Sequence, residues 1–316
     1  MQPLVSFLLP AYKVQHLDKA IKSILNQSFN DFELIVVNDC SPDDIENIVK
    51  KYHDDRLRYY KNGKNIGGKD LVAQWNQCLN YAKGEWSVMA SDDDIYHPDF
   101  LQEMISLSEK YPQNDVFHCN ILTIDDNDRI IDVSHQIGEH ETILQNFYYR
   151  MTYQRIEAFQ DYFIRTSRLK QIGGYLYFPL ATFSDITTIV SIAGNNGIIC
   201  SNKYLFKWRC NGKNISTNPN TCIDRIKACE KLISWIESNY SMFDFLDDEV
   251  SLWIKERFLS DIHYKTTESV KYLVQQMPIE DLKAMLKQKN WTYRLIDRKY
   301  VKRNRLVRIK NTLTLR

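Results

Sequence analysis

The sequence contains no apolar run that approaches the roughly 20 residues needed to cross a bilayer as a helix. Its start, Met1-Gln2-Pro3, lacks the basic segment and the long apolar stretch of a secretory signal peptide. Seven cysteines are present, but they form no C-x-x-C pair and no zinc-ligand spacing. We therefore expect a cytoplasmic protein with reduced thiols, and neither a membrane-spanning protein nor a zinc protein.

Other common site motifs are also missing. The stretch Gly67-Gly68-Lys69 fits neither the P-loop nor the dinucleotide-binding fingerprint. His135, Glu139 and His140 lie close together in the sequence but lack H-E-x-x-H spacing. These absences argue against a phosphate loop, a dinucleotide site and a zinc-protease site.

What is present is the composition of a folded globular protein. Of the 316 residues, 44% are hydrophobic and 26% are charged, as is typical of chains that bury a substantial core. This length suits one large domain or two of ordinary size. The 41 Lys and Arg nearly balance the 40 Asp and Glu, but eight of the basic residues lie in 298–316, which has no acidic residue. The rest of the chain is therefore acidic.

The basic segment 298–316 fits three interpretations. The first is a solvated or partly disordered end. The second is contact with an anionic membrane surface, because Leu306, Ile309 and Leu313 recur at helical spacing among Lys and Arg. Nucleic-acid binding comes third and is not expected, since no nucleic-acid motif accompanies the charge. A membrane contact would place the protein peripherally at the inner membrane face.

Strand and helix signals alternate through the first part of the chain. Short apolar runs at 4–9, 32–37, 57–60 and 86–90 predict buried strands, and amphipathic helical stripes separate them. This order predicts an α/β fold with a doubly wound, mostly parallel sheet and helices on both faces. Ligands of such sheets bind beyond the carboxyl ends of the strands.

A polar stretch from Thr217 to Asn220 marks the expected domain boundary. Beyond it the apolar residues follow helical spacing, as in the stripe Cys222, Ile226, Cys229, Ile233 and Ile236. We expect an α/β domain over 1–216 and a helical C-terminal region over 217–316 that ends in the basic segment.

Acidic residues follow two of the expected strands. Ser91-Asp92-Asp93-Asp94 comes after the run 86–90, and Asp39 comes after the run 32–37. Adjacent carboxylates repel one another, and a bound divalent cation relieves that repulsion while substrate phosphate oxygens complete its shell. A metal–diphosphate site is one interpretation of the triple-Asp turn, and a solvated turn that caps the next helix is the other. Asp39 could bind a base or ribose, or could form an ordinary turn.

The ordered set of these motifs is more specific than any one of them. The set is Pro10-Ala11-Tyr12, Asn38-Asp39-Cys40-Ser41-Pro42-Asp43, Asn65-Ile66-Gly67-Gly68, Trp75-Asn76, Ala82-Lys83-Gly84-Glu85-Trp86 and Ser91-Asp92-Asp93-Asp94-Ile95-Tyr96-His97-Pro98. It resembles the nucleotide-sugar-binding half of the family 2 glycosyltransferases, over roughly residues 3–216. The resemblance implies a GT-A-like fold for these residues, and the helical C-terminal region predicted above would be an extension of it.

The resemblance also implies roles for individual residues. The implied nucleotide-binding positions are Pro10, Ala11, Tyr12, Asn65, Gly67, Asp39, Asp92 and Arg209. Asp93 matches the metal ligand of the family's Asp-x-Asp motif, with Asp92 beside it, and the implied cofactor is Mn²⁺ or Mg²⁺. Ser91 stands where the first acid of that motif often stands.

A second group of matches lies further along the chain. Gly173-Gly174-Tyr175 matches a family turn, and Ser184-Asp185 stands in the place of a Glu-Asp pair, so the resemblance implies that Asp185 is the general base. A helix N-cap is the alternative role for Ser184 or Asp185. The segment 208–216 resembles the closing motif of the family, with Asn211 in the place of its His.

The resulting hypothesis is a metal-dependent, inverting glycosyltransferase. It would move a sugar from a nucleotide sugar, such as a UDP-sugar, to a hydroxyl of a glycan or lipid-linked acceptor in the biosynthesis of a surface polysaccharide. Two alternatives stay open. One is a catalytically silent module that binds sugar nucleotides, because Ser91, Ser184 and Asn211 depart from the family pattern. The other is a nucleotidyltransferase, although Pro10-Ala11-Tyr12 replaces the Gly-rich loop expected there.

Overall fold

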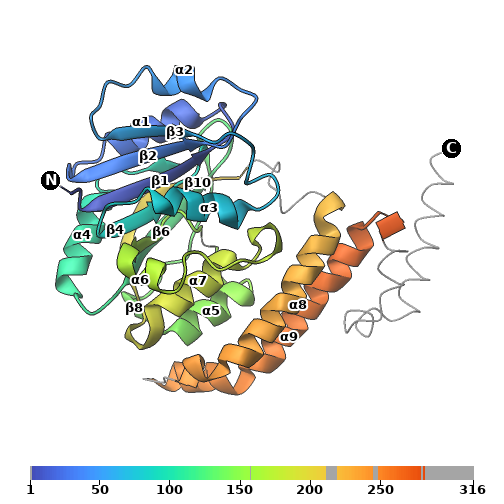
Figure 1. Ribbon diagram of the computed structural model, residues 1–316. Coiled ribbons are helices and arrows are strands. Elements are labelled where there is room, and N and C mark those ends of the chain that lie inside the picture. Colours follow the sequence, from blue (N-terminus) through green and yellow to red (C-terminus); the bar gives the residue numbers. More distant parts are fainter. Residues whose placement is uncertain (1, 157, 211–218, 245–247, 279, 282–316) are drawn as a thin grey trace.

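The computed structural model describes residues 2–156, 158–210, 219–244, 248–278 and 280–281. Their centre is a sheet of ten strands with helices on both faces (Figure 1). The strands are β1 (Val5–Ala11), β2 (Phe32–Asn38), β3 (Leu57–Lys61), β4 (Trp86–Met89), β5 (Ile95–Tyr96), β6 (Val116–Ile124), β7 (Ile130–Val133), β8 (His140–Glu141), β9 (Phe163–Arg165) and β10 (Ile198–Arg209).

The helices alternate with these strands in the first half of the chain and dominate its end. They are α1 (Leu17–Leu25), α2 (Ile45–Val49), α3 (Leu71–Asn80), α4 (Phe100–Lys110), α5 (Ile143–Met151), α6 (Thr166–Gln171), α7 (Ser184–Ala193), α8 (Cys222–Asn239) and α9 (Glu249–Gln276). The four strands expected in the first ninety residues are all present, within two residues of their expected bounds.

The strand order explains how distant residues meet. It runs β3-β2-β1-β4-β9-β6-β10-β5, with β7 beside β6 and β8 beside β10. β1 pairs in parallel with both β2 and β4, so Ala11 lies opposite Asn38 and Leu8 lies opposite Met89. The carboxyl ends of these three strands therefore meet at one edge of the sheet, where a ligand of a doubly wound sheet binds.

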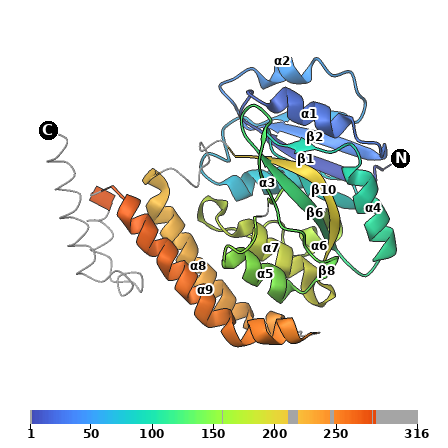
Figure 2. The same ribbon diagram turned by 180° about the vertical axis from the view of Figure 1, so that it is seen from behind.

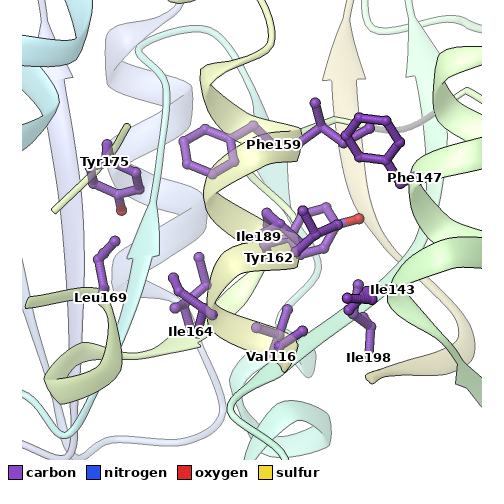
Figure 3. Close-up of a cluster of buried hydrophobic side chains, with 14 of the residues drawn as sticks. Val116, Ile143, Phe147, Phe159, Tyr162, Ile164, Leu169, Tyr175, Ile189 and Ile198 are labelled. Atoms are coloured by element: carbon purple, nitrogen blue, oxygen red, sulfur yellow. The ribbon is translucent and has the colours of Figure 1, made fainter. Parts of the chain in front are cut away.

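Both faces of the sheet are buried, which is why β1, β2 and β4 are mostly apolar and buried along almost their whole length. Along β1, Phe7 and Leu9 enter one core cluster and Leu8 enters the other, as the period of two in a strand requires. Figure 3 shows part of the second cluster, where Phe147 of α5 and Ile189 of α7 approach the sheet.

The strands β9 and β10 were not predicted from the sequence. β9 runs antiparallel between β4 and β6, and β10 runs parallel to β6. β9 has three residues, too few for a periodic signal, and β10 carries register shifts near Tyr204. Residues 116–133 form two strands, β6 and β7, which a turn separates.

The helical extension shares its core with the rest of the protein. α8 and α9 run side by side (Figures 1 and 2). Leu232 of α8 and Phe258 of α9 are fully buried in the same cluster as Leu8 of β1, and Phe258 lies with its ring 5.7 Å from that of Phe147.

The expected boundary at 217–220 and the basic segment 298–316 fall largely or wholly outside the described residues, so the division at 216 stays a prediction. Within the described part of the chain, no helix is long and apolar enough to cross a membrane.

The shared core gives a direct test of this packing. Phe258→Ala should lower the free energy of unfolding by about 3–5 kcal/mol, because it opens a cavity between α9 and α5. The neighbouring Leu259 is 39% exposed, and Leu259→Ala should cost less than about 1 kcal/mol. Urea denaturation followed by circular dichroism measures both. If the helical extension and the sheet of the wild type unfolded in two separate transitions, that result would contradict a shared core.

Candidate functional site

The end of β1 is bound to the triple-Asp turn by two hydrogen bonds. The backbone N–H groups of Tyr12 and Lys13 donate to Oδ2 of Asp92, at 2.8 and 2.7 Å. Asp92 follows β4, which is the neighbour of β1 in the sheet. Its carboxyl is desolvated by the surrounding protein, and this raises the pKa of Asp92 to about 6 despite the two donors. The predicted residues Tyr12 and Asp92 are therefore in direct contact.

The other side of the β1 end is bound to Asp39. The backbone N–H of Asp39 donates to the carbonyl oxygen of Ala11 at 3.0 Å, and Ser41 donates through Oγ to the carbonyl of Tyr12 at 2.6 Å. Asp39 and Asp92 thus flank one strand end. The hypothesis of a metal–diphosphate site requires this placement, because a nucleotide and its cation can contact both segments only if the two lie on the same side of the molecule.

The carboxylate of Asp39 also fixes the loop that follows β3. It accepts hydrogen bonds from the backbone N–H groups of Ile66 at 2.8 Å and Gly67 at 2.7 Å, and from Nδ2 of Asn62 at 2.8 Å. A Cβ at position 67 would stand 3.0 Å from Oδ2 of Asp39, so Gly67 allows this close approach. Asn65 accepts from the N–H of Gly68 and shapes the same loop. The predicted residues Asn65 and Gly67 therefore lie beside Asp39.

The three aspartates of the turn have different environments. Asp94 is buried, accepts from the backbone N–H of Arg209 at 2.7 Å, and receives the hydroxyl of Ser91. Burial and then the neighbouring charge of Asp93 raise the pKa of Asp94 to about 8. Asp93 is partly exposed, and within the described residues no hydrogen bond or ion pair engages its carboxylate. The turn is therefore more than a solvated cap, since Asp94 is buried and hydrogen-bonded while Asp93 stays partly exposed.

The site fits a cation that completes its shell with substrate atoms. Among the residues that the structure describes, no three or more His, Cys, Asp or Glu side chains are grouped so as to hold a metal ion. The carboxylate of the partly exposed Asp93 nevertheless offers the hard oxygen ligand that Mg²⁺ and Mn²⁺ accept. Mg²⁺ in particular uses one or two carboxylates together with phosphate oxygens and water. Asp93 is hence the best-placed ligand, with Asp92 next to it.

Arg209 lies under this turn with its side chain fully buried. Its Nε donates to the backbone carbonyl of Asp93 at 2.8 Å, Nη1 to the carbonyl of Asp125 at 2.6 Å, and Nη2 to Oδ1 of Asp128 at 2.6 Å. These contacts direct the guanidinium into the protein. A contact between Arg209 and a diphosphate stays a prediction.

Asp185 lies in the first turn of α7 and forms an ion pair. Nη2 of Arg150, on α5, donates to Oδ2 of Asp185 at 2.5 Å. Oδ1 of Asp185 engages no hydrogen bond within the described residues, and its side chain is 26% exposed. The N-cap alternative is wrong, because Phe183 is the N-cap residue and Ser184 instead accepts from the N–H of Phe178. Sequence reasoning missed Arg150, which no motif marks.

The backbone before Asp185 is strained. Leu180, Ala181 and Phe183 all have left-handed φ angles, of 57°, 56° and 72°. Each such non-glycine residue is unfavourable by roughly 1–3 kcal/mol and persists only where the surrounding packing enforces it. Strain of this kind concentrates at functional sites. Nothing in the residue types of this segment signals it.

A known protein family matches the part of the chain that contains the β1 end. The profile described as glycosyl transferase family 2 matches residues 6–170, which is more than half of the chain. The chain belongs to this family. Its matched region includes the ends of β1, β2 and β4 and the triple-Asp turn, but it ends before Asp185.

Curated relatives match over shorter stretches. The chain is 31% identical over 121 residues to the putative colanic acid biosynthesis glycosyl transferase WcaA of Escherichia coli, covering 37% of this chain and 42% of the relative. It is 41% identical over 100 residues to a Campylobacter jejuni GalNAc(5)-diNAcBac-PP-undecaprenol beta-1,3-glucosyltransferase, covering 29% and 30%. The chain thus spans well under half of the length of these relatives.

Solved structures share the fold over almost the whole chain. S. aureus TarS 1-349 in complex with UDP-GlcNAc aligns with a TM-score of 0.64 and 20% identity, covering 95% of this chain and 88% of TarS. The mannosyltransferase PcManGT of Pyrobaculum calidifontis, in complex with GDP-Man and Mn²⁺, aligns with a TM-score of 0.54 and 14% identity, covering 97% and 87%. The predicted GT-A-like sheet with a helical C-terminal extension is confirmed.

The raised pKa of Asp94 predicts a pH-dependent stability. The folded state keeps a proton that the unfolded state loses above its pKa near 3.8, so the free energy of unfolding falls as the pH rises from about 4 to about 8. Asp94→Asn, which copies the protonated carboxyl, should be more stable than wild type at pH 8. One pKa unit corresponds to about 1.4 kcal/mol, so even part of this shift is measurable.

Urea denaturation at pH 5, 6, 7 and 8 without metal tests this prediction. The gain of Asp94→Asn should shrink steadily toward pH 5. Asp99→Asn is the matched control, because it removes a carboxylate from the same region at an exposed position. A gain that is equal at every pH would show that the proton on Asp94 is not its cause.

Proposed function

We propose that the protein transfers a sugar from a nucleotide sugar to an acceptor hydroxyl with the help of a divalent cation. The observation that carries this proposal is the placement of Asp39 and Asp92 on the two sides of the β1 end, with the partly exposed Asp93 next to Asp92. A nucleotide could lie across this end with its diphosphate at Asp93.

The donor would contact three segments. Pro10, Ala11 and Tyr12 at the end of β1 would face the nucleotide, and Tyr12 is 41% exposed and offers a ring for stacking. The loop that Asp39 holds would form a second wall. A UDP-sugar is our first candidate, since TarS, of the same fold, was solved with UDP-GlcNAc; a GDP-sugar is the second, since PcManGT was solved with GDP-Man.

A Mn²⁺ or Mg²⁺ ion held by Asp93, with Asp92 adjacent, would offset the charge that grows on the nucleoside diphosphate as it leaves. The complex of PcManGT with Mn²⁺ supports a divalent cation in this fold.

Asp185 would accept the proton from the acceptor hydroxyl. Its Oδ1, which no described residue engages in a hydrogen bond, would take part in this step, while the ion pair of Oδ2 with Arg150 holds the carboxylate in one orientation. The acceptor oxygen forms a bond to the anomeric carbon, the bond from that carbon to the diphosphate oxygen breaks, and the nucleoside diphosphate leaves with the electron pair. Attack opposite the leaving group inverts the configuration.

The acceptor in this proposal is a glycan or a lipid-linked saccharide in polysaccharide biosynthesis. The names of the relatives, which refer to colanic acid and to an undecaprenol-linked saccharide, support this class. A cytoplasmic location with peripheral membrane contact through 298–316 would bring the enzyme to such an acceptor.

Asp185→Asn tests the proton step. Turnover should fall by roughly 10²–10⁴-fold, because a general base contributes about that much. The dissociation constant of the nucleoside diphosphate with Mn²⁺ should not change, since the donor contacts lie at the β1 end. Release of nucleoside diphosphate during transfer measures the first quantity, and calorimetry measures the second. The control is Asp224→Asn, which also breaks an ion pair in the first turn of a helix. Unchanged turnover in Asp185→Asn would exclude Asp185 as the base.

Asp93→Asn tests the metal ligand. In the wild type, Mn²⁺ should strengthen the binding of UDP or GDP and raise the melting temperature of the complex. Asp93→Asn should lose most of this gain while keeping the weaker binding measured with EDTA. Asp99→Asn, six residues further along the chain, should behave as wild type. If wild type binds the nucleotides equally well with and without Mn²⁺, metal-dependent transfer at this site is wrong.

A further inference from the structure

We propose that Arg209 is a positioning residue. Its side chain connects the triple-Asp turn to the turn between β6 and β7 and so holds Asp93 in place. This inference rests on the proposed function, because it assigns Arg209 an effect on metal-dependent donor binding. This role is distinct from the direct diphosphate contact expected from the sequence, which stays a prediction.

The geometry joins Arg209 to the turn at two successive residues. The backbone N–H of Arg209 donates to the carboxylate of Asp94, and Nε donates to the carbonyl of Asp93. Neither bond uses the carboxylate of Asp93, which no hydrogen bond or ion pair engages among the described residues. Any shift of Arg209 would therefore move the backbone that carries the metal ligand.

The rest of the guanidinium is anchored in the turn between β6 and β7. Nη1 donates to the carbonyl of Asp125, and Nη2 donates to Oδ1 of Asp128. Asp128 has a left-handed φ of 66°, and it also accepts from Nζ of Lys19 on α1. Hydrogen bonds from Lys19 and Arg209 outweigh partial burial and hold the pKa of Asp128 below its usual range. Asp128 is thus the charged partner that compensates the buried guanidinium.

Burial makes this arrangement rigid. The side chain of Arg209 is 0% exposed, and a buried charge without its partner destabilises a protein strongly. The planar guanidinium can satisfy the Asp93 carbonyl only while its other donors stay on Asp125 and Asp128. The turn between β6 and β7 is therefore fixed in position relative to the triple-Asp turn. Residues that orient a metal ligand in this way typically change metal affinity by about 10–100-fold when they are removed.

Asp128→Gly is the test variant, because glycine adopts a positive φ without strain and removes the whole carboxylate. The measurement is the ratio of nucleotide dissociation constants with Mn²⁺ and with EDTA, by calorimetry on the full chain. We expect the Mn²⁺-dependent gain to fall about tenfold, with binding in EDTA unchanged. Asp128→Asn, which keeps an acceptor oxygen, should recover part of the gain. Arg209→Lys, which replaces the planar guanidinium by a single ammonium group, should lose the same part of the gain as Asp128→Gly, provided that the variant folds.

Two controls separate positioning from general destabilisation. Asp115→Asn weakens another Arg–Asp pair, with Arg165, at the opposite end of β6, and should lower the melting temperature without changing the ratio. Lys19→Met removes the exposed partner of Asp128 and should leave the ratio close to wild type. An equal ratio in Asp128→Gly and Asp115→Asn would overturn the inference. A wild type with no Mn²⁺-dependent gain would instead contradict the proposed function.

Discussion

The site depends on the parallel pairing of β1 with both β2 and β4. This pairing brings the ends of three strands to one edge of the sheet, and the first residues beyond them are Tyr12, Asp39 and the triple-Asp turn. Hydrogen bonds between backbone N–H groups and carboxylates then fix the position of each segment. The negative charges are held close together because several donors compensate them.

The same bonds divide the acids by role. Asp39 holds a loop, Asp92 holds the β1 end, and Asp94 is turned into the protein. Asp93 is the one acid of the turn whose carboxylate stays without such a bond among the described residues, so the surrounding network leaves it available for a ligand. The buried Arg209 extends this network to β6, β7 and α1. A single carboxylate can serve as a metal ligand here because many other groups hold its backbone.

The second half of the protein contributes in a different way. α8 and α9 share a core with α5 and α7, and these two helices carry Arg150 and Asp185. The strained segment from Leu180 to Phe183 precedes Asp185 directly. The packing of the helical extension against the strained segment and α5 therefore helps to determine where the proposed base stands.

The amino-acid sequence by itself determined the early strands, the helical stripes of the extension and the candidate acids. Buried strands and amphipathic helices have periodic signals, and Asp39 and Asp92–Asp94 directly follow such strands. The order of these motifs was enough to indicate the family.

Only the tertiary structure decided how these residues are used. β9 is too short for a pattern, and β10 is irregular, so their places between and beside other strands come from long-range pairing. The inward turn of Asp94, the buried contacts of Arg209 and the ion pair of Arg150 with Asp185 join residues that are 35 to 116 positions apart. Local spacing carries no information about such pairs, because hydrogen bonds between distant segments form only after the chain has packed.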